Sequence, residues 1–341
     1  MKKSLMTLGV LALFVLMAYG QEKKFALYSV AFYNMENLFD TIHDEGKNDY
    51  EYLPNGTNQW NTMKYKAKLK NMSEILSMLS TDKLPMGPAI IGVSEIENYR
   101  VLEDILKQPA LADRGYQYVH YEGADQRGVD CAFFYNPKLF ELTNSKLVPY
   151  VYINDTVHKT RGFLIASGNI AGEKMHFIVN HWPSRAAASP ARERAGKQVR
   201  AIKDSLLRED SAAKIVIMGD MNDDPMDKSM AVALGAKRKP ADVGPTDLYN
   251  PWWDTLKKGY GTLMYKGKWN LFDQIVFTGN LLGTDRSTLK FYKHEIFSRD
   301  FMFQKEGKYK GYPKRTQAGG VWLNGYSDHL PTIIYLIKEV K

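Results

Sequence analysis

Acidic, amide and imidazole side chains recur beside apolar segments along this chain. Near the C-terminal end, Asp328 and His329 directly precede the apolar run PTIIYLI. Taken singly, each such cluster could be a turn, a helix cap or an ion pair. Their repetition at the ends of apolar runs instead indicates a site, because strand ends in α/β folds are where sites are built. The other members of this set are Asn34, Glu36, Glu95, Asn180, His181, Asp220, Asn222 and Asp273.

These residue types are suited to metal-assisted hydrolysis. Oxygen ligands without cysteine favour Mg²⁺, Mn²⁺ or Ca²⁺ over zinc. A histidine beside a carboxylate, such as His329 beside an acid, can act as a general base. A divalent cation and an acid-oriented histidine together suit phosphate ester hydrolysis, because the cation neutralises developing charge while the base deprotonates water.

Seven apolar segments rich in β-branched and aromatic residues predict the strands that position these groups. Apolar residues at helical spacing from Tyr65 to Leu79 predict an amphipathic helix, and residues 191–207 predict another. Strands and helices interleave without a Pro/Gly/Ser-rich linker, which indicates one α/β domain over residues 25–338. The predicted strands cover residues 25–34, 89–95, 131–137, 175–182, 214–220, 271–277 and 331–337.

Residues 1–20 have a different character from the rest of the chain. They begin with Lys2 and Lys3, continue as an apolar run and end with small residues at Ala18 and Gly20. This pattern is typical of a secretory signal peptide, and the run is short for a membrane span. An uncleaved N-terminal anchor is the alternative. We expect an exported monomer, periplasmic or secreted, without a stable membrane anchor.

The overall composition is that of a globular protein, with 44% hydrophobic and 25% charged residues. The formal net charge of +8 is compatible with a polyanionic substrate and equally with solubility alone. Cys131 is the only cysteine, so no internal disulfide can form even in an oxidising compartment. Stability must therefore come from a sizeable core.

Six motifs in order resemble the endonuclease/exonuclease/phosphatase superfamily, which includes deoxyribonuclease I and the neutral sphingomyelinases. The resemblance covers nearly all of the chain that follows the predicted signal peptide. It implies a four-layer α/β/β/α sandwich of two packed mixed β-sheets flanked by helices. It also implies a metal-dependent phosphoester hydrolase, most similar to an exported bacterial endonuclease-like branch. The motifs are AFYNMENLFD, VSEIEN, NHWPSR, GDMND, FDQIV and SDH.

The resemblance implies a metal site centred on Glu95, which matches the principal metal ligand. Glu36 matches a position that can assist through water, and Asp328 matches a carboxylate that supports the site or holds a second metal. Asn34 resembles a residue that supports both the metal and the phosphate. The expected cofactor is Mg²⁺, with Mn²⁺ or Ca²⁺ as alternatives.

The resemblance also implies the catalytic groups. Asp220 and Asn222 match the pair that contacts the attacking water and the scissile phosphate. Asp273 resembles the acid that orients His329, and either Asp220 or His329 could be the general base, with His329 favoured. His181 resembles a second histidine that contacts the phosphate or donates a proton to the leaving oxygen.

Three further residues are candidates for the same site. In deoxyribonuclease-like relatives a glutamate orients the histidine at the position of His181, and here the nearest carboxylate is Asp130, displaced by about one position. Period-two alternation could direct Asp130 into the site, or it could form a surface salt bridge. Arg127 and Arg185 are candidate phosphate clamps because a guanidinium matches phosphate oxygens, although arginine on a loop is often simply solvated.

Nucleic acid is the expected substrate, and the expected activity is that of an endonuclease. The segment 291–316 interleaves aromatic with basic residues, which suits stacking on bases, or it is an ordinary surface insertion. One alternative is a phosphodiesterase or phosphatase acting on a small-molecule or lipid ester, as in sphingomyelinase-like or inositol-phosphatase-like relatives. A catalytically inactive binding protein of the same fold would be expected to have lost a site residue, and all are present.

Overall fold

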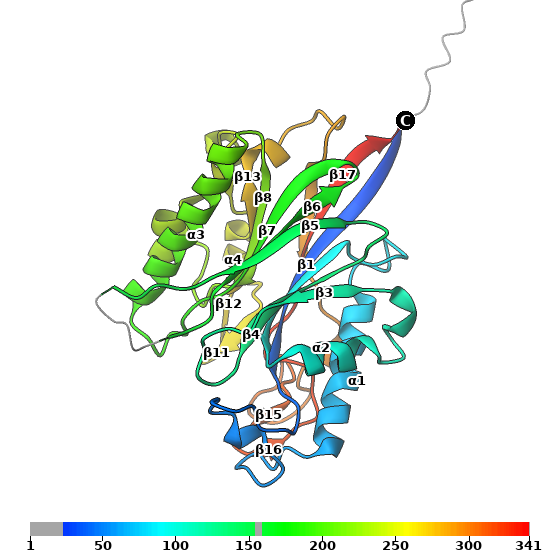
Figure 1. Ribbon diagram of the computed structural model, residues 1–341, viewed down its shortest axis with the longest axis vertical. Helices are drawn as coiled ribbons and strands as arrows, with labels where there is room; N and C mark the ends of the chain where they lie inside the picture. Colours follow the sequence, from blue (N-terminus) through cyan, green and yellow to red (C-terminus); the bar gives the residue numbers. More distant parts are fainter. Residues whose placement is uncertain (1–22, 154–158, 341) are drawn as a thin grey trace, which may run out of the picture.

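Two large β-sheets pack face to face in the computed structural model, which describes residues 23–153 and 159–340 (Figure 1). The predicted signal peptide, residues 1–20, lies outside the described residues. The described residues contain no helix long and apolar enough to cross a membrane.

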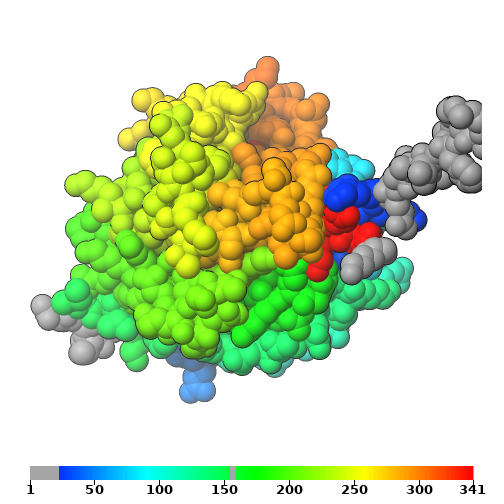
Figure 2. All heavy atoms as spheres, turned by 90° about the horizontal axis from the view of Figure 1, so that it is seen from above, coloured from blue at the N-terminus to red at the C-terminus, as the bar shows by residue number. Residues whose placement is uncertain are grey.

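The first sheet has six strands in the order β14-β17-β1-β2-β4-β3. It is mixed, because β1 pairs antiparallel with β17 and parallel with β2. Seen from above, the N-terminal (blue) and C-terminal (red) segments accordingly lie side by side (Figure 2). The strands are β1 Lys24–Leu38, β2 Ile90–Ile96, β3 Gln117–His120, β4 Asp130–Tyr135, β14 Lys290–Ile296 and β17 Thr332–Val340.

The second sheet has seven strands in the order β5-β6-β7-β8-β13-β10-β9, and it is also mixed, with β7 and β8 parallel. Two hairpins, β11–β12 and β15–β16, lie outside the large sheets. The strands of the second sheet are β5 Glu141–Val148, β6 Phe163–Ile170, β7 Glu173–His181, β8 Lys214–Asp220, β9 Ala236–Lys237, β10 Leu248–Tyr249 and β13 Asp273–Thr278. The hairpin strands are β11 Leu263–Tyr265, β12 Lys268–Asn270, β15 Gln317–Ala318 and β16 Val321–Trp322.

Within the described residues, four α-helices accompany the sheets. Asn61 caps the first helix, because its side chain accepts a hydrogen bond from the Lys64 backbone N–H. Asn98 caps the second in the same way, accepting from the Arg100 and Val101 N–H groups. The helices are α1 Thr62–Met78, α2 Tyr99–Leu106, α3 Ser189–Glu209 and α4 Trp253–Lys257.

Alternation along the strands divides the apolar side chains among three core layers. In β1, Val30 and Phe32 enter the core between the sheets, whereas Ala31 and Tyr33 face α1 and α2. In the second sheet, strands β7 and β8 alternate in the same manner between the central core and α3. The result is a four-layer α/β/β/α sandwich, as the resemblance implied.

Each of the seven predicted strands and both predicted helices has a counterpart in the structure, with ends shifted by up to a few residues. Strands β5 and β6 were not predicted, because β5 is partly exposed and polar, and β6 contains small and polar residues. The segment 291–316 is not simply an insertion. Its beginning belongs to β14, which forms the edge of the first sheet beside β17.

Candidate active site

Strand register brings three of the predicted residues into one row, at the ends of three neighbouring strands of the second sheet. Asp220 at the end of β8 pairs with His181 on β7 and with Asp273 on β13. The first sheet contributes Asn34 from β1 and Glu95 from β2, which faces the row from across the sandwich. Residues far apart in sequence therefore meet because both sheets end at the same place.

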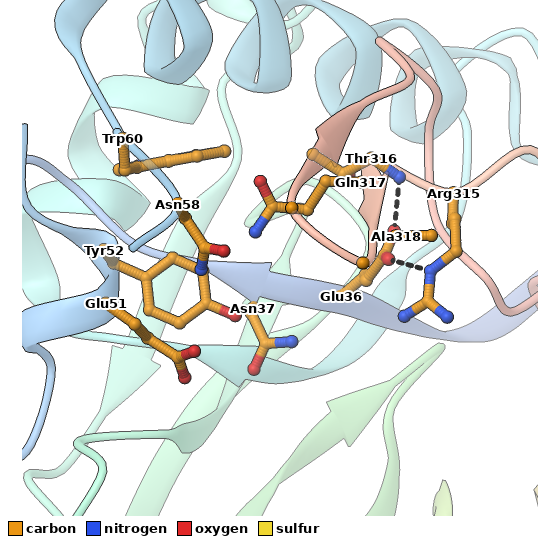
Figure 3. Close-up of a pocket in the computed structure, with 12 residues that line it drawn as sticks. Glu36, Asn37, Glu51, Tyr52, Asn58, Trp60, Arg315, Thr316, Gln317 and Ala318 are labelled. Carbon is orange, nitrogen blue, oxygen red and sulfur yellow. Dashed lines mark hydrogen bonds and ion pairs between the residues drawn. The ribbon is translucent and has the colours of Figure 1, made fainter. Parts of the chain in front are cut away.

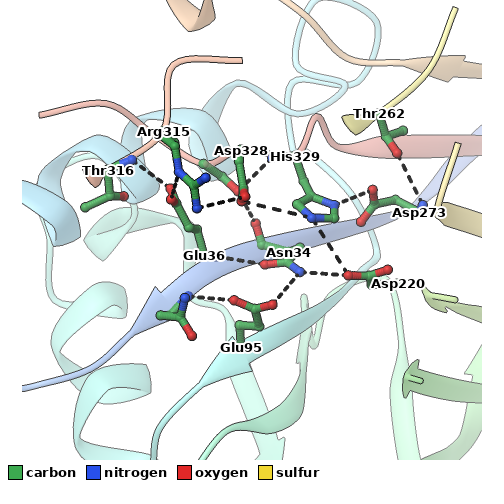
Figure 4. Close-up of polar contacts among 12 residues, drawn as sticks. Asn34, Glu36, Glu95, Asp220, Thr262, Asp273, Arg315, Thr316, Asp328 and His329 are labelled. Carbon is green, nitrogen blue, oxygen red and sulfur yellow. Dashed lines mark hydrogen bonds and ion pairs between the residues drawn. The ribbon is translucent and has the colours of Figure 1, made fainter. Parts of the chain in front are cut away.

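His329 and Asp273 form a buried pair (Figure 4). The Nδ1 atom of His329 lies 2.7 Å from Asp273 Oδ2, and both side chains are buried. The backbone N–H of His329 donates to Ser327 Oγ, whose hydroxyl donates to the Asn34 carbonyl. This arrangement fixes the ring and directs Nε2 toward Asp220 Oδ2, 3.8 Å away.

Asn34 bridges the two sheets at the centre of the site. Its Nδ2 donates to Glu95 Oε1 at 3.1 Å and to Asp220 Oδ2 at 3.0 Å. Its Oδ1 accepts from the Glu36 backbone N–H at 2.8 Å. The other Glu95 oxygen accepts from the Asn37 N–H. One fully buried amide thus sets the separation of two carboxylates that come from different sheets.

Strained backbone conformations are concentrated around this site. Four non-glycine residues here have positive φ angles: Glu36 at 46°, Asn37 at 51°, Glu95 at 58° and Asn222 at 52°. Positive φ is uncommon for glutamate in particular, and such strain persists only where surrounding contacts hold it. At Asn222, those contacts are an N–H bond to Asp220 Oδ1 and an Nδ2 bond to the Trp182 carbonyl.

Burial and neighbouring charge shift the titration of the central groups. Burial raises the pKa of Asp220 above its usual range, and the Asp273 and Glu95 charges add to this rise, while His329 opposes it. Burial disfavours the charged form of His329, but Asp273 and Asp220 outweigh it and raise the His329 pKa well above its usual value. The protonation of Asp220 therefore depends on that of His329, and the two side chains titrate together.

His181 has the opposite character. Burial, followed by the Arg161 and Arg127 charges, lowers the pKa of His181 well below its usual value. Its buried Nδ1 has no hydrogen-bond partner among the described residues, and Nε2 lies 3.6 Å from Glu95 Oε1 and 3.7 Å from Asp220 Oδ2. A neutral ring with its proton on Nε2 leaves no buried N–H unpaired, so His181 presents a hydrogen-bond donor to the site.

The arrangement fits a divalent cation. Ligand atoms of Glu95, Asp220 and His181 lie within 4.8 Å of one another. The Glu95 and Asp220 carboxylates, of which Glu95 is the more exposed, are the groups that would hold the ion while His181 Nε2 keeps its proton. Several carboxylates crowd here, and their mutual repulsion contributes to the raised pKa of Asp220. Carboxylate oxygens with room for water are the ligands that Mg²⁺ and Mn²⁺ prefer.

Arg315 contacts both Glu36 and Asp328, and Asp328 Oδ1 also lies 4.0 Å from His329 Nε2 (Figure 4). Arg315 Nε donates to Glu36 Oε1 at 2.8 Å, and its Nη2 lies 3.1 Å from Asp328 Oδ2. The second Glu36 oxygen accepts from the Thr316 N–H. Glu36 is therefore not among the groups gathered around Glu95, and a role through water stays a prediction. Sequence reasoning missed Arg315, although it lies in the basic segment 291–316.

An open cleft of about 430 Å³ leads to the central groups. Arg127 lines it with a half-exposed side chain, which lies 3.6 Å from Asp125. Arg161 lines it from a buried position, donating to Asp125 Oδ2 and to the Trp182 carbonyl. Nothing in the sequence around Arg161 distinguished it, because its partner Asp125 is distant along the chain.

Two sequence-based expectations need correction. Asp130 does not orient His181: its Oδ2 lies 3.3 Å from His120 Nε2 and accepts from the Gly123 N–H. The one-position displacement was decisive, because neighbouring side chains on a strand face opposite ways.

Arg185 is the second correction. It does not line the cleft, and its guanidinium is engaged by the acidic loop after β8. It lies 3.2 Å from Asp224, 2.9 Å from Asp227 and over the Phe272 ring at 4.4 Å. The guanidinium is therefore used structurally and is not free to clamp a phosphate.

Comparisons with known proteins agree with this fold. An endonuclease/exonuclease/phosphatase family protein from Bacteroides thetaiotaomicron has a similar structure, with a TM-score of 0.57 at 15% identity over 93% of this chain and 97% of that chain. The mannosyl-6-phosphatase of Bacteroides thetaiotaomicron VPI-5482 gives a TM-score of 0.56 at 15% identity, covering 91% and 99%. D. rerio TDP2 complexed with a single-strand DNA product gives 0.53 at 14% identity, covering 91% and 99%.

At these identities the structural likeness establishes the fold. No curated protein sequence matches the chain. Residues 29–338, however, match the family described as Endonuclease/Exonuclease/phosphatase family. The match spans every site residue described above, and the chain therefore belongs to the endonuclease/exonuclease/phosphatase family of metal-dependent phosphoester hydrolases.

Proposed function

We propose that this protein is an endonuclease that hydrolyses nucleic-acid phosphodiester bonds with a divalent cation, most simply Mg²⁺. The observation that carries the hydrolytic part is the buried Asp273–His329 pair, which lies across from Glu95 and Asn34. This is the acid–base and metal-ligand equipment that attack by water requires.

Each site residue has a separate role in the proposed reaction. Asp273 holds the His329 ring with Nε2 facing Asp220, and His329 and Asp220 together take up the proton of an attacking water. Asn222, beside Asp220, and the His181 Nε2–H donate to phosphate oxygens. Glu95 would hold the divalent cation, whose positive charge would stabilise the transition state. The leaving oxygen takes its proton from solvent, because the neutral His181 ring can donate a hydrogen bond but has no spare proton to transfer.

The cleft supports a polyanionic substrate. Arg127 lines it together with the catalytic groups, so a phosphate beside the scissile bond would meet its half-exposed guanidinium. The formal net charge of +8 is consistent with this interpretation. A structural neighbour, D. rerio TDP2, has been seen with a single-strand DNA product.

Hydrolysis assays with residues 21–341 test this proposal. Supercoiled plasmid, single-stranded RNA, sphingomyelin, mannose 6-phosphate and bis-p-nitrophenyl phosphate would be compared in Mg²⁺, Mn²⁺, Ca²⁺ and EDTA. We expect plasmid nicking or RNA cleavage that stops in EDTA and returns with Mg²⁺ or Mn²⁺. Turnover of the sugar phosphate or of the lipid, without nucleic-acid cleavage, would contradict the endonuclease assignment. Undiminished activity in EDTA would contradict the metal role.

The proposal also includes export and a monomeric state. Export rests on the charged, apolar and small-residue order of residues 1–20. N-terminal sequencing of protein recovered outside the cytoplasm should begin after this segment, and recovery of uncleaved protein only from the cytoplasm would contradict export. Light scattering should give the mass of one chain.

A further inference from the structure

A second pocket adjoins the active site beyond Glu36. It has a volume of about 210 Å³, and the loop after β1 forms one wall while β15 and the residues before it form the other (Figure 3). Arg315 joins it to the catalytic centre by bridging Glu36 and Asp328. Asn37, in the lining, donates its N–H to Glu95 at 3.0 Å. A substrate group in this pocket would therefore lie beside a phosphate held near Glu95.

Uncommitted polar groups line the pocket. The side chains of Asn37, Glu51, Asn58 and Gln317 and the Tyr52 hydroxyl have no hydrogen-bond partner within residues 23–153 and 159–340. The Gln317 amide extends into the pocket toward Asn58 (Figure 3). Polar groups that a fold leaves unpaired at one concave place are available to bond a ligand.

Hydrogen bonds and ring packing hold the wall formed by the loop after β1, which lowers the entropic cost of binding. The Asn58 N–H donates to the Glu51 carbonyl, and the Trp60 N–H to that of Leu53. Trp60 Nε1 donates to the Phe39 carbonyl at 3.0 Å. The Tyr52 ring stacks on Phe39 with centroids 4.2 Å apart. The polar side chains therefore stand on a framework that does not need to form on binding.

The charged side chains in and beside the pocket restrict the charge of the ligand that it can bind. Arg315 is the one cationic side chain in the described lining, and Glu36 and Asp328 already occupy its Nε and Nη2 atoms. With the Glu51 carboxylate opposite, a second phosphate would be repelled. An uncharged group with adjacent donors and acceptors fits instead. The volume is below the roughly 300–1,000 Å³ typical of pockets for whole drug-sized ligands, so it suits one ring system.

Nucleobase edges have this chemistry. Asparagine and glutamine amides pair with a donor and an acceptor side by side, and glutamate accepts from an exocyclic amine. Bases that are unstacked from a single strand are recognised in the same way. We propose that this pocket binds the nucleobase next to the scissile phosphate, and that Glu51, Asn58 and Gln317 read its edge. This inference rests on the nucleic-acid substrate proposed above.

Cleavage specificity gives the first test. The double variant Asn58→Ala/Gln317→Ala would be compared with wild type on single-stranded oligonucleotides that have one hydrolysable linkage and differ only in the adjoining base. We expect wild type to prefer one base on the order of tenfold in kcat/KM, and the variant to lose that preference. Hydrolysis of bis-p-nitrophenyl phosphate, which has no base, should not change. An unchanged preference, or an equal loss on both substrates, would overturn the inference.

A binding measurement separates this inference from the proposed function, because it needs no hydrolysis. Free nucleosides and methyl glycosides would be titrated into wild type in EDTA by calorimetry. Nucleoside binding that the double variant loses supports the pocket assignment even if no nucleic acid is cleaved. Glycoside binding in place of nucleoside binding, or no binding of either, would overturn it. Asn55→Ala is the matched control, since Asn55 is exposed in the same loop and does not line the pocket.

Discussion

At the scale of single residues, some polar groups of the site are hydrogen-bonded within the protein and hold its geometry, whereas others face the space where a substrate would bind. Asp273 is committed to His329, and Asn34 is committed to Glu95 and Asp220. The Nε2 atoms of His329 and His181 instead face the space between the carboxylates. This division suits reaction with a phosphate, because the committed groups fix the geometry while the two Nε2 atoms face the space that water and phosphate would occupy.

The two arginines predicted from sequence as phosphate clamps should behave differently when replaced. Arg127→Ala should raise KM for a nucleic acid and reduce its salt dependence, because Arg127 lines the cleft with a half-exposed side chain. Arg185→Ala should mainly lower the melting temperature, by roughly 2–4 °C per kcal/mol lost, because its guanidinium joins the acidic loop after β8.

Steady-state kinetics at several salt concentrations and thermal melts of both variants check this contrast, with each variant serving as the other's control. An increase in KM confined to Arg185→Ala would show that Arg185, and not Arg127, binds the phosphate.

At the scale of elements, strand register explains how much the sequence could predict. His181, Asp220 and Asp273 were placed correctly at strand ends because apolar runs mark buried strands plainly. Gly219 permits the close approach of β7 and β8, since a Cβ there would lie 2.3 Å from the Asn180 carbonyl oxygen. The carboxylate at Asp130 could not be placed, because a displacement of one residue changes the face of the sheet.

Long-range pairings were beyond what the sequence could predict. Arg161 meets Asp125, and Arg315 meets Glu36, only after the chain has folded. No local pattern marks either arginine, since a loop arginine has the same sequence appearance whether solvated or paired. The pocket beside Glu36 was missed for the same reason: its walls are separated by more than 250 residues.

At the scale of the whole molecule, the two sheets are joined by charge as well as by the central core. Glu173 on β7 forms ion pairs with Lys214 on β8 and, at 2.8 Å, with Lys338 on β17 of the other sheet. It also accepts the Leu289 N–H. Burial disfavours the charged form of Glu173, but the hydrogen bonds from Lys214 and Lys338 outweigh it and lower its pKa.

This cluster makes stability depend on pH. Because the folded pKa of Glu173 is lowered, its contribution is present above the unfolded value of about 4.3 and is lost as pH falls through the folded value. Glu173→Gln should therefore lower the melting temperature at pH 7, by about 2–4 °C if the loss is near 1 kcal/mol. The difference from wild type should shrink at acidic pH.

Melting curves of both proteins from neutral to acidic pH measure this difference. A difference that stays constant or grows as the pH falls would mean that the Glu173 charge does not join the sheets.

The catalytic role of His329 is tested most directly by the rate of bis-p-nitrophenyl phosphate hydrolysis in Mg²⁺ or Mn²⁺. Wild type and His329→Ala would be compared, with melting temperatures measured alongside. If His329 is the general base held by Asp273, the variant should lose roughly 10²–10⁴-fold in kcat while it melts like wild type. A folded variant that hydrolyses the diester at nearly the wild-type rate would contradict the assignment of this cluster as the catalytic centre.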